Sequence, residues 1–229
     1  MDTGGRKATN TVQQSMTISG TLLLTQWLSP SYPLGSFAYS HGLETAIAQG
    51  WVTDAARLQN WLEDVLGVGS GRADAILLQA AYRARTMAEL ADIDRTGRAF
   101  STCHERRRES LHQGAAFART TRAVWGDELP DLLFPVALGW ESARHNLPET
   151  LATSMYLHAF ASNIIMACVR LVPLGQTEGQ AILNGLTSLC ARIATDVQGA
   201  SLDDLFSNAF FSDIAAMRHE TLQPRLFQS

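Results

Sequence analysis

Apolar residues recur at steps of three and four along most of this chain, and this spacing constrains its fold more than any other feature. The pattern is longest over residues 55–65, 76–91 and 182–197. Residues three and four apart share one face of an α-helix, so each segment has an apolar stripe to bury. The sequence sustains no strand-like alternation of apolar and polar residues, and its long segments are rich in good helix formers. We therefore predict an all-α fold.

Clusters of Pro and Gly interrupt the helical pattern and predict a single-domain bundle of about eight to nine helices. Residues 148–172 differ from the rest because their apolar residues occur all round the helical wheel, starting at Pro148. We expect this segment to be the buried central helix. Tyr156, Asn163 and Arg170 follow one another at intervals of seven and so share one of its faces. Alternatively, Arg170 only covers the carbonyls at the helix end.

Length and charge limit the organisation of the chain and its partners. With 229 residues, of which 46% are hydrophobic, it can bury one sizeable core. We expect a flexible polar tail over 1–20, one all-α domain over 21–216 and a C-terminal tail over 217–229. The net charge of −4 provides no overall attraction to nucleic acid or to an anionic membrane.

Targeting and membrane signals are not predicted. The first 20 residues are polar and lack the apolar core of a secretory signal. The most apolar long segment, 151–172, is interrupted by polar residues and an arginine, unlike a membrane-spanning helix. We therefore expect a cytoplasmic protein that binds neither nucleic acid nor membrane. Its three cysteines form no CxxC pair, which argues against disulfides and a structural zinc site.

The residues predict no catalytic or cofactor site. The stretch "GVGSGR" (67–72) lacks the GK[ST] of a phosphate-binding loop and joins two helical segments. His41 and Glu44 form the close pair with plausible metal-ligand spacing, but two ligands do not make a site. His158 lies in an apolar helix, where a hydrogen-bonded core histidine is more common than a ligand. We expect no enzyme activity, no cofactor and no resident metal.

Charged residues concentrate in "CHERRRESLHQ" (103–113). Residues one turn apart on a helix can pair, so Glu105 and Glu109 have arginine partners within the segment. We expect this run to be a solvated helix face.

The end of the chain is unusually apolar, with Arg225, Leu226 and Phe227 directly after Pro224. Chain ends are usually polar and frayed, whereas aromatic residues and Arg are favoured anchors in interfaces. The residues leave two alternatives open. This segment either docks back onto its own core or binds another protein.

Four blocks of sequence, in order, resemble the UreF family of urease accessory proteins. The resemblance extends over residues 20–229. The blocks are "SPSYPLGSFAYSHGLE" (29–44) with "GWV" (50–52), "GAAFAR" (114–119), "RLVPLGQ" (170–176) with "GQ" (179–180), and "RHETLQPRLFQS" (218–229).

The resemblance implies an all-α homodimer that is not an enzyme and takes part in the maturation of nickel-dependent urease. Proteins of this family bind the accessory protein UreD, also called UreH. Through that complex they bind the GTPase UreG, which delivers nickel to apo-urease. The implied role is a scaffold that regulates the GTPase cycle.

The resemblance also implies which residues bind partners. The C-terminal tail is implied to order against UreD, and Arg170 matches a basic position that the family uses toward the GTPase. The candidate partner-binding residues are Arg170, Gln176, His219, Arg225, Leu226 and Phe227.

The broken segment 29–44 carries several large apolar side chains, each worth about 1.5–3 kcal/mol when fully buried. Some of them must be core, and the resemblance implies that the rest shape the dimer and the face toward partners. The candidate residues of this loop are Pro33, Gly35, Phe37, Tyr39, Gly42 and Glu44.

Two other functions stay open at this point. A metallochaperone or metal conduit would handle nickel directly through His41, Glu44 or His219. A small-molecule enzyme would need a pocket with perturbed acid–base groups. Stoichiometric nickel binding by the isolated chain distinguishes the metallochaperone from the scaffold.

Overall fold

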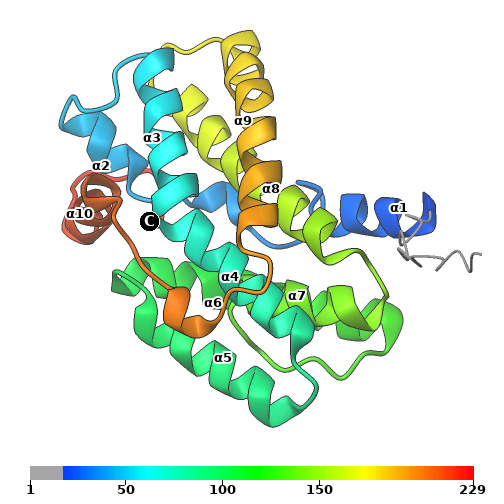
Figure 1. The fold of residues 1–229 in the computed structure, drawn as a ribbon. Helices are drawn as coiled ribbons and strands as arrows, with labels where there is room; N and C mark the ends of the chain where they lie inside the picture. The colour runs from blue at the N-terminus through cyan, green and yellow to red at the C-terminus, as the bar shows by residue number, and fades with distance from the viewer. Residues whose placement is uncertain (1–17) are drawn as a thin grey trace, which may run out of the picture.

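A computed structural model describes residues 18–229, and it confirms the all-α fold, with no strand among these residues. Helix α1 begins inside the expected polar tail, whose residues 1–17 lie outside the described part of the chain. Two short 3-10 helices accompany the α-helices (Figure 1). The elements are α1 (Ile18–Trp27), η1 (Ser36–Ala38), α2 (Leu43–Ala48), α3 (Ala55–Val68), α4 (Ser70–Arg83), α5 (Met87–Phe100), α6 (His104–Trp125), α7 (Phe134–Arg144), α8 (Glu149–Leu171), α9 (Gln176–Asp196), η2 (Leu202–Asp204) and α10 (Phe210–His219).

Helix α8 is the central helix that the sequence predicts. It follows Pro148, and it packs against α9, α4, α7 and α2. Its length and composition would also allow it to cross a membrane, but the core helices of soluble proteins can have the same length and composition. More than half of its most apolar stretch is buried inside the protein. Its all-round apolar character therefore reflects neighbours on several sides.

Helices α3 and α5 begin at capping residues that each satisfy one of their first N–H groups. Asp54 accepts a hydrogen bond from the main-chain N–H of Arg57 at the start of α3. Thr86 accepts one from the N–H of Glu89 at the start of α5. Such caps stabilise a helix by about 0.5–2 kcal/mol. The stretch at 67–71 is the predicted helix–helix turn, because Gly69 separates α3 from α4.

Helices α4 and α7 approach each other closely at Gly139. A Cβ atom at this position would lie 2.1 Å from the carbonyl oxygen of Leu78. This distance is far below van der Waals contact, and the obstacle is main chain that cannot rotate away. The absence of a side chain at Gly139 is therefore a condition of the α4–α7 contact.

The end of the chain returns to α2, in the N-terminal part of the fold. Helix α10, red in Figure 1, lies beside α2, blue in the same view. At Gly42, which precedes α2, a Cβ atom would lie 2.5 Å from the main-chain nitrogen of Ala216. Gly42 also has a φ of 75°, in the left-handed region. This contact places the residues after α10 over the first turns of α2 and α6.

We predict that Gly139→Ala lowers the free energy of unfolding by about 1–3 kcal/mol or more, because the added methyl group overpacks the α4–α7 contact. Gly185→Ala is the matched control. Gly185 is exposed in α9, and its nearest neighbour would be 3.9 Å from the new Cβ. This control should gain about 0.5–1 kcal/mol from helix propensity. Urea denaturation measures both values, and equal effects of the two substitutions would contradict the prediction.

Candidate functional site

The residues that follow α10 are held against the bundle by buried side chains of α2 and α6. We call this arrangement the C-terminal clasp. It consists of Glu44, Glu105, His219 and Arg225, together with the main chain of residues 226–229. The C-terminal segment is thus docked on its own core, one of the two alternatives that the sequence leaves open.

Glu44, in the first turn of α2, is the centre of the clasp. Its Oε1 accepts a hydrogen bond from the main-chain N–H of Leu226 at 2.7 Å, and its Oε2 accepts one from that of Phe227 at 3.0 Å. The Nε2 atom of His219 lies 3.2 Å from the same Oε2. Both carboxylate oxygens of this buried side chain are therefore occupied within the chain.

His219 connects Glu44 to Glu105. Its ring is completely buried, and its Nδ1 lies 2.7 Å from Oε2 of Glu105. Each ring nitrogen faces a carboxylate, so both contacts are hydrogen bonds when both nitrogens carry a hydrogen. The other oxygen of Glu105 accepts from Nη1 of Arg225 at 2.6 Å. The clasp thus alternates acidic and basic groups, the arrangement that buried charges require.

The last residues pair with the main chain beside η1. The N–H of Gln228 donates to the carbonyl of Ala38 at 2.8 Å, and the N–H of Ser40 donates to the carbonyl of Ser229 at 2.7 Å. The hydroxyl of Ser229 donates to Oε2 of Glu109 at 3.0 Å. These hydrogen bonds hold residues 226–229 between η1 and α6.

A second set of buried charges lies under the clasp. The Nε2 atom of His41 lies 2.9 Å from Oε1 of Glu109, and Arg106 pairs with Asp74. Burial acts to raise the pKa of Glu109, but the charges of His41 and Arg106 outweigh it and hold this pKa below its usual value. The hydroxyl of Tyr156 donates to Asp74 at 2.5 Å, and burial with this neighbouring carboxylate raises the tyrosine pKa. These contacts join α6 to α4 and α8 through Asp74.

The structure corrects the prediction that residues 103–113 form a solvated face. Glu105 and Glu109 are buried, and the side chain of Arg106 is nearly so. The face of α6 that carries them lies under the C-terminal segment. Their partners come from residues more than a hundred positions away in sequence, such as Arg225 and His219, as well as from neighbours. Local spacing alone could not identify these partners.

On the outside of the clasp, Arg170 meets two of the other predicted residues. Its guanidinium lies over the ring of Phe227, 5.2 Å from the centroid, and its Nη2 donates to the carbonyl of Phe37 at 3.2 Å. Phe227 is buried, whereas Leu226 is 79% exposed and Phe37 is 67% exposed. The Nε of Arg170 also donates to the main-chain carbonyl of Met166 at 3.1 Å, which agrees with the interpretation that this side chain covers carbonyls near the helix end.

The remaining predicted residues have separate roles. Gln176 is exposed at the start of α9 and makes no hydrogen bond to the clasp within the described chain. Of the loop residues, Pro33 is exposed and Gly35 has a φ of 73°. Tyr39 is buried, and its hydroxyl lies 3.3 Å from Nδ1 of His112. Much of the apolar surface of this segment is therefore core, as expected.

The pair His41 and Glu44 does not converge on a common point. His41 contacts Glu109, whereas Glu44 contacts His219. Sequence reasoning also missed Glu105 and Glu109 as members of the buried network. Their spacing of four and the apolar residues on the same face of α6 were the available signals.

Comparisons with known proteins agree on one family. A family model described as UreF matches residues 52–187. The urease accessory protein UreF of Roseobacter denitrificans is 47% identical over 214 residues, which cover 93% of this chain and 96% of that protein. UreF of Ruegeria pomeroyi is 49% identical over 208 residues, covering 91% and 96%. UreF of Cereibacter sphaeroides is 50% identical over 208 residues, covering 91% and 98%.

We predict that Glu44→Gln loosens the C-terminal clasp. The amide keeps the size of the side chain but offers one acceptor oxygen where two N–H groups and His219 now converge, and each lost charge-assisted bond costs about 1.5–3 kcal/mol. Hydrogen exchange of residues 220–229 should accelerate while that of α8 stays slow. Glu63→Gln, an exposed change on α3, is the control. Unchanged exchange at residues 226 and 227 would show that Glu44 does not hold the segment.

Proposed function

The chain belongs to the UreF family of urease accessory proteins, and on that basis we propose that it is a non-enzymatic scaffold for nickel insertion into urease. In this role it binds UreD, also called UreH. Through that complex it binds the GTPase UreG, which delivers nickel to apo-urease, and it regulates the GTPase cycle. We propose that it does so as a cytoplasmic homodimer, in which the exposed Pro33 and Phe37 of the loop belong to the dimer or partner face.

The observation that supports this proposal most is that two predicted partner-binding residues, Arg170 and Leu226, lie close to Phe37 of the predicted dimer loop. Arg170 comes from the end of α8, Phe37 from η1, and Leu226 from the C-terminal segment. The guanidinium of Arg170 contacts both the loop and the segment. Aromatic, aliphatic and Arg side chains are the usual anchors of protein interfaces.

Helix α10, which leads into the clasp, also carries exposed apolar side chains. Phe210 and Phe211 are each about two-thirds exposed, at 66% and 69%, and Met217 is half exposed. Exposed apolar groups gathered on one element mark sites of protein interaction. Because α10 leads directly into the clasp, UreD can cover both together.

The clasp lowers the conformational-entropy cost of binding a partner protein. Ordering a flexible tail on a partner costs conformational entropy, and a segment that is already fixed avoids most of that cost. Here the main chain at Leu226 and Phe227 is bonded to Glu44 before any partner arrives. The proposed docking segment is thus presented in one conformation.

Direct nickel handling through His41, Glu44 and His219 has less support. Both oxygens of Glu44 and both ring nitrogens of His219 already have partners within the chain. A cation at this point would have to displace hydrogen bonds that hold the C-terminal segment. We therefore keep the metallochaperone as the second candidate, which predicts nickel binding that is lost in His219→Gln.

We predict that Leu226→Asp abolishes or strongly weakens binding to UreD without unfolding the chain, because this side chain is exposed and its main-chain bond to Glu44 remains. Truncating an interface anchor costs about 2 kcal/mol or more, roughly a thirtyfold loss. Light scattering on a sizing column measures the mass of the mixture. Val124→Asp, the same change at a 59% exposed site on α6, is the control. A normal complex with Leu226→Asp would contradict UreD docking on this segment.

We predict that Arg170→Ala keeps UreD binding but weakens recruitment of UreG to the complex about fivefold or more, the effect of losing an interface contact worth over 1 kcal/mol. Arg170→Lys should recover only part of it, because an ammonium keeps the charge but lacks the planar guanidinium. Titration of labelled UreG measures the affinity, with the exposed Arg192→Ala on α9 as control. Equal affinity of Arg170→Ala and the control would exclude Arg170 from the GTPase contact.

A further inference from the structure

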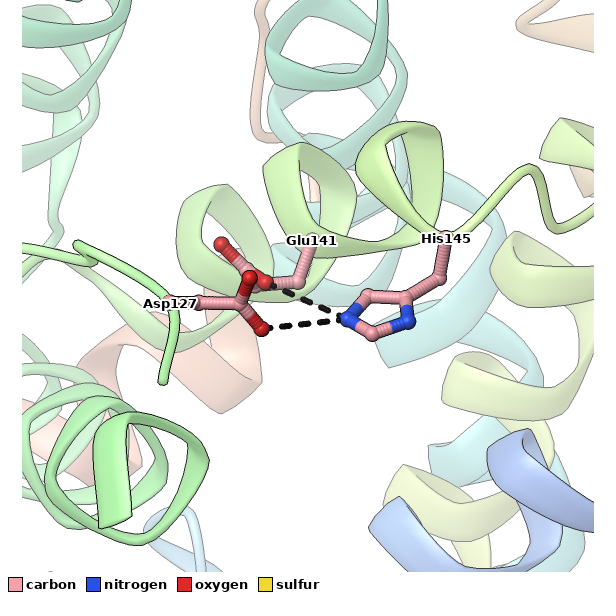
Figure 2. A group of neighbouring side chains, drawn as sticks. All are labelled: Asp127, Glu141 and His145. Atoms are coloured by element: carbon pink, nitrogen blue, oxygen red, sulfur yellow. Dashed lines mark hydrogen bonds and ion pairs between the residues drawn. The ribbon is translucent and has the colours of Figure 1, made fainter. Parts of the chain in front are cut away.

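Three potential metal ligands meet away from the clasp, at Asp127, Glu141 and His145. Figure 2 shows Glu141 near the end of α7 and His145 directly after this helix, with both side chains turned toward Asp127 from the segment after α6. The Nε2 atom of His145 lies 3.1 Å from Oδ2 of Asp127 and 3.7 Å from Oε2 of Glu141. One ligand atom from each residue lies within 4.8 Å of the other two. We call these residues the α7 triad.

Glu141 is the unusual member of the triad. Its side chain is completely buried, yet neither carboxylate oxygen has a hydrogen-bond partner in the described part of the chain. A buried carboxylate without hydrogen-bond donors is costly, because it loses its hydration and keeps only the longer ion-pair contacts with Arg144 and His145, each at 3.7 Å. The carboxylate of Asp127 faces the same nitrogen of His145, so two acidic groups share one point. The pair of carboxylates therefore needs either a shared proton or a cation.

We propose that the α7 triad binds one divalent first-row transition ion, such as Zn²⁺ or Ni²⁺. Ligands about 2.0–2.2 Å from a tetrahedral ion lie roughly 3.3–3.6 Å from each other, and the two distances from His145 Nε2 are on either side of that range. An imidazole beside two carboxylates favours transition ions over Mg²⁺ or Ca²⁺, which prefer oxygen alone. The fourth position remains for water or a ligand from elsewhere.

The spacing of the triad supports this assignment. Glu141 and His145 are four residues apart, so they lie on one face of α7, as paired metal ligands on helices do. The imidazole ring is held in place by Trp27 and Trp125, whose rings pack edge-on against it with centroids 5.3 and 6.3 Å away. A ligand that is fixed before binding needs little reorganisation.

The guanidinium of Arg144 already contacts both carboxylates, so a bound metal ion would have to share the site with it. Its Nη2 lies 3.5 Å from Oδ1 of Asp127, and its Nε lies 3.7 Å from Oε1 of Glu141. Both contacts are long, and the side chain is 46% exposed. The guanidinium can therefore turn toward solvent when an ion binds, whereas Glu141 has no such freedom.

Isothermal titration of the purified full chain with ZnCl₂, and separately with NiCl₂, tests the proposal. We expect one ion per chain, with affinity lowered about tenfold or more in Glu141→Gln and in His145→Gln, because each removes a ligand. Glu128→Gln is the matched control, since it removes an exposed carboxylate next to Asp127 and should bind like the original chain. Ni²⁺ should also quench the fluorescence of Trp27 and Trp125 in the original chain but not in His145→Gln.

Three results would overturn the proposal. The first is absence of binding by the original chain, which would mean that the carboxylates share a proton instead. The second is binding that His145→Gln and Glu141→Gln leave unchanged, which would place the ion elsewhere. The third is loss of binding in Glu128→Gln alone. Circular dichroism confirms that each variant is folded, and Asp127→Asn, at a half-buried ligand, replaces any variant that is not. Nickel binding at the clasp would be lost in His219→Gln, whereas binding at the α7 triad is lost in His145→Gln, so these two variants distinguish this proposal from the metallochaperone. The titration uses neither UreD nor UreG, so it does not depend on the scaffold role.

Discussion

The carboxylate of Glu44 joins the two ends of the fold, and the surface at the C-terminus depends on it. It is buried at the start of α2 and takes three contacts from residues more than 170 positions away. A buried charge is tolerated only when all its acceptor sites are used, and removal of one partner leaves the rest uncompensated. The clasp is therefore a single arrangement: His219, Arg225 and the main chain of residues 226 and 227 order together.

The same constraint decides which side chains face outward. Because the N–H groups of Leu226 and Phe227 are both directed at Glu44, these neighbouring residues have little freedom to exchange places. Phe227 is buried beneath the guanidinium of Arg170, and Leu226 is left exposed beside it. The proposed contacts to UreD and to the GTPase are thus parts of one surface, and its shape depends on the buried carboxylate of Glu44.

The sequence predicts what depends on local spacing and misses what depends on distant contacts. Helical periodicity predicts the all-α fold, and Pro148 with the all-round apolar pattern predicts the central helix α8. Local spacing predicts a solvated helix face for the charged segment 103–113, because the residues that cover it lie at the far end of the chain. His41 and Glu44 have ligand-like spacing, yet each turns to a different partner. For the α7 triad, the spacing of Glu141 and His145 is visible in the sequence, but the approach of Asp127 depends on the connection between α6 and α7.

The two acidic clusters of this protein differ in how completely their charges are matched. In the clasp, Glu44 and Glu105 accept hydrogen bonds from histidine, arginine and main-chain groups that also hold the C-terminal segment. This complete matching indicates a structural role, since an added cation would find no free oxygen. In the triad, Glu141 is as deeply buried but its oxygens have no hydrogen-bond donor among the described residues. A folded chain keeps such a cost only where something compensates it, and the imidazole of His145 directed at the same point makes a cation the better candidate than a proton alone.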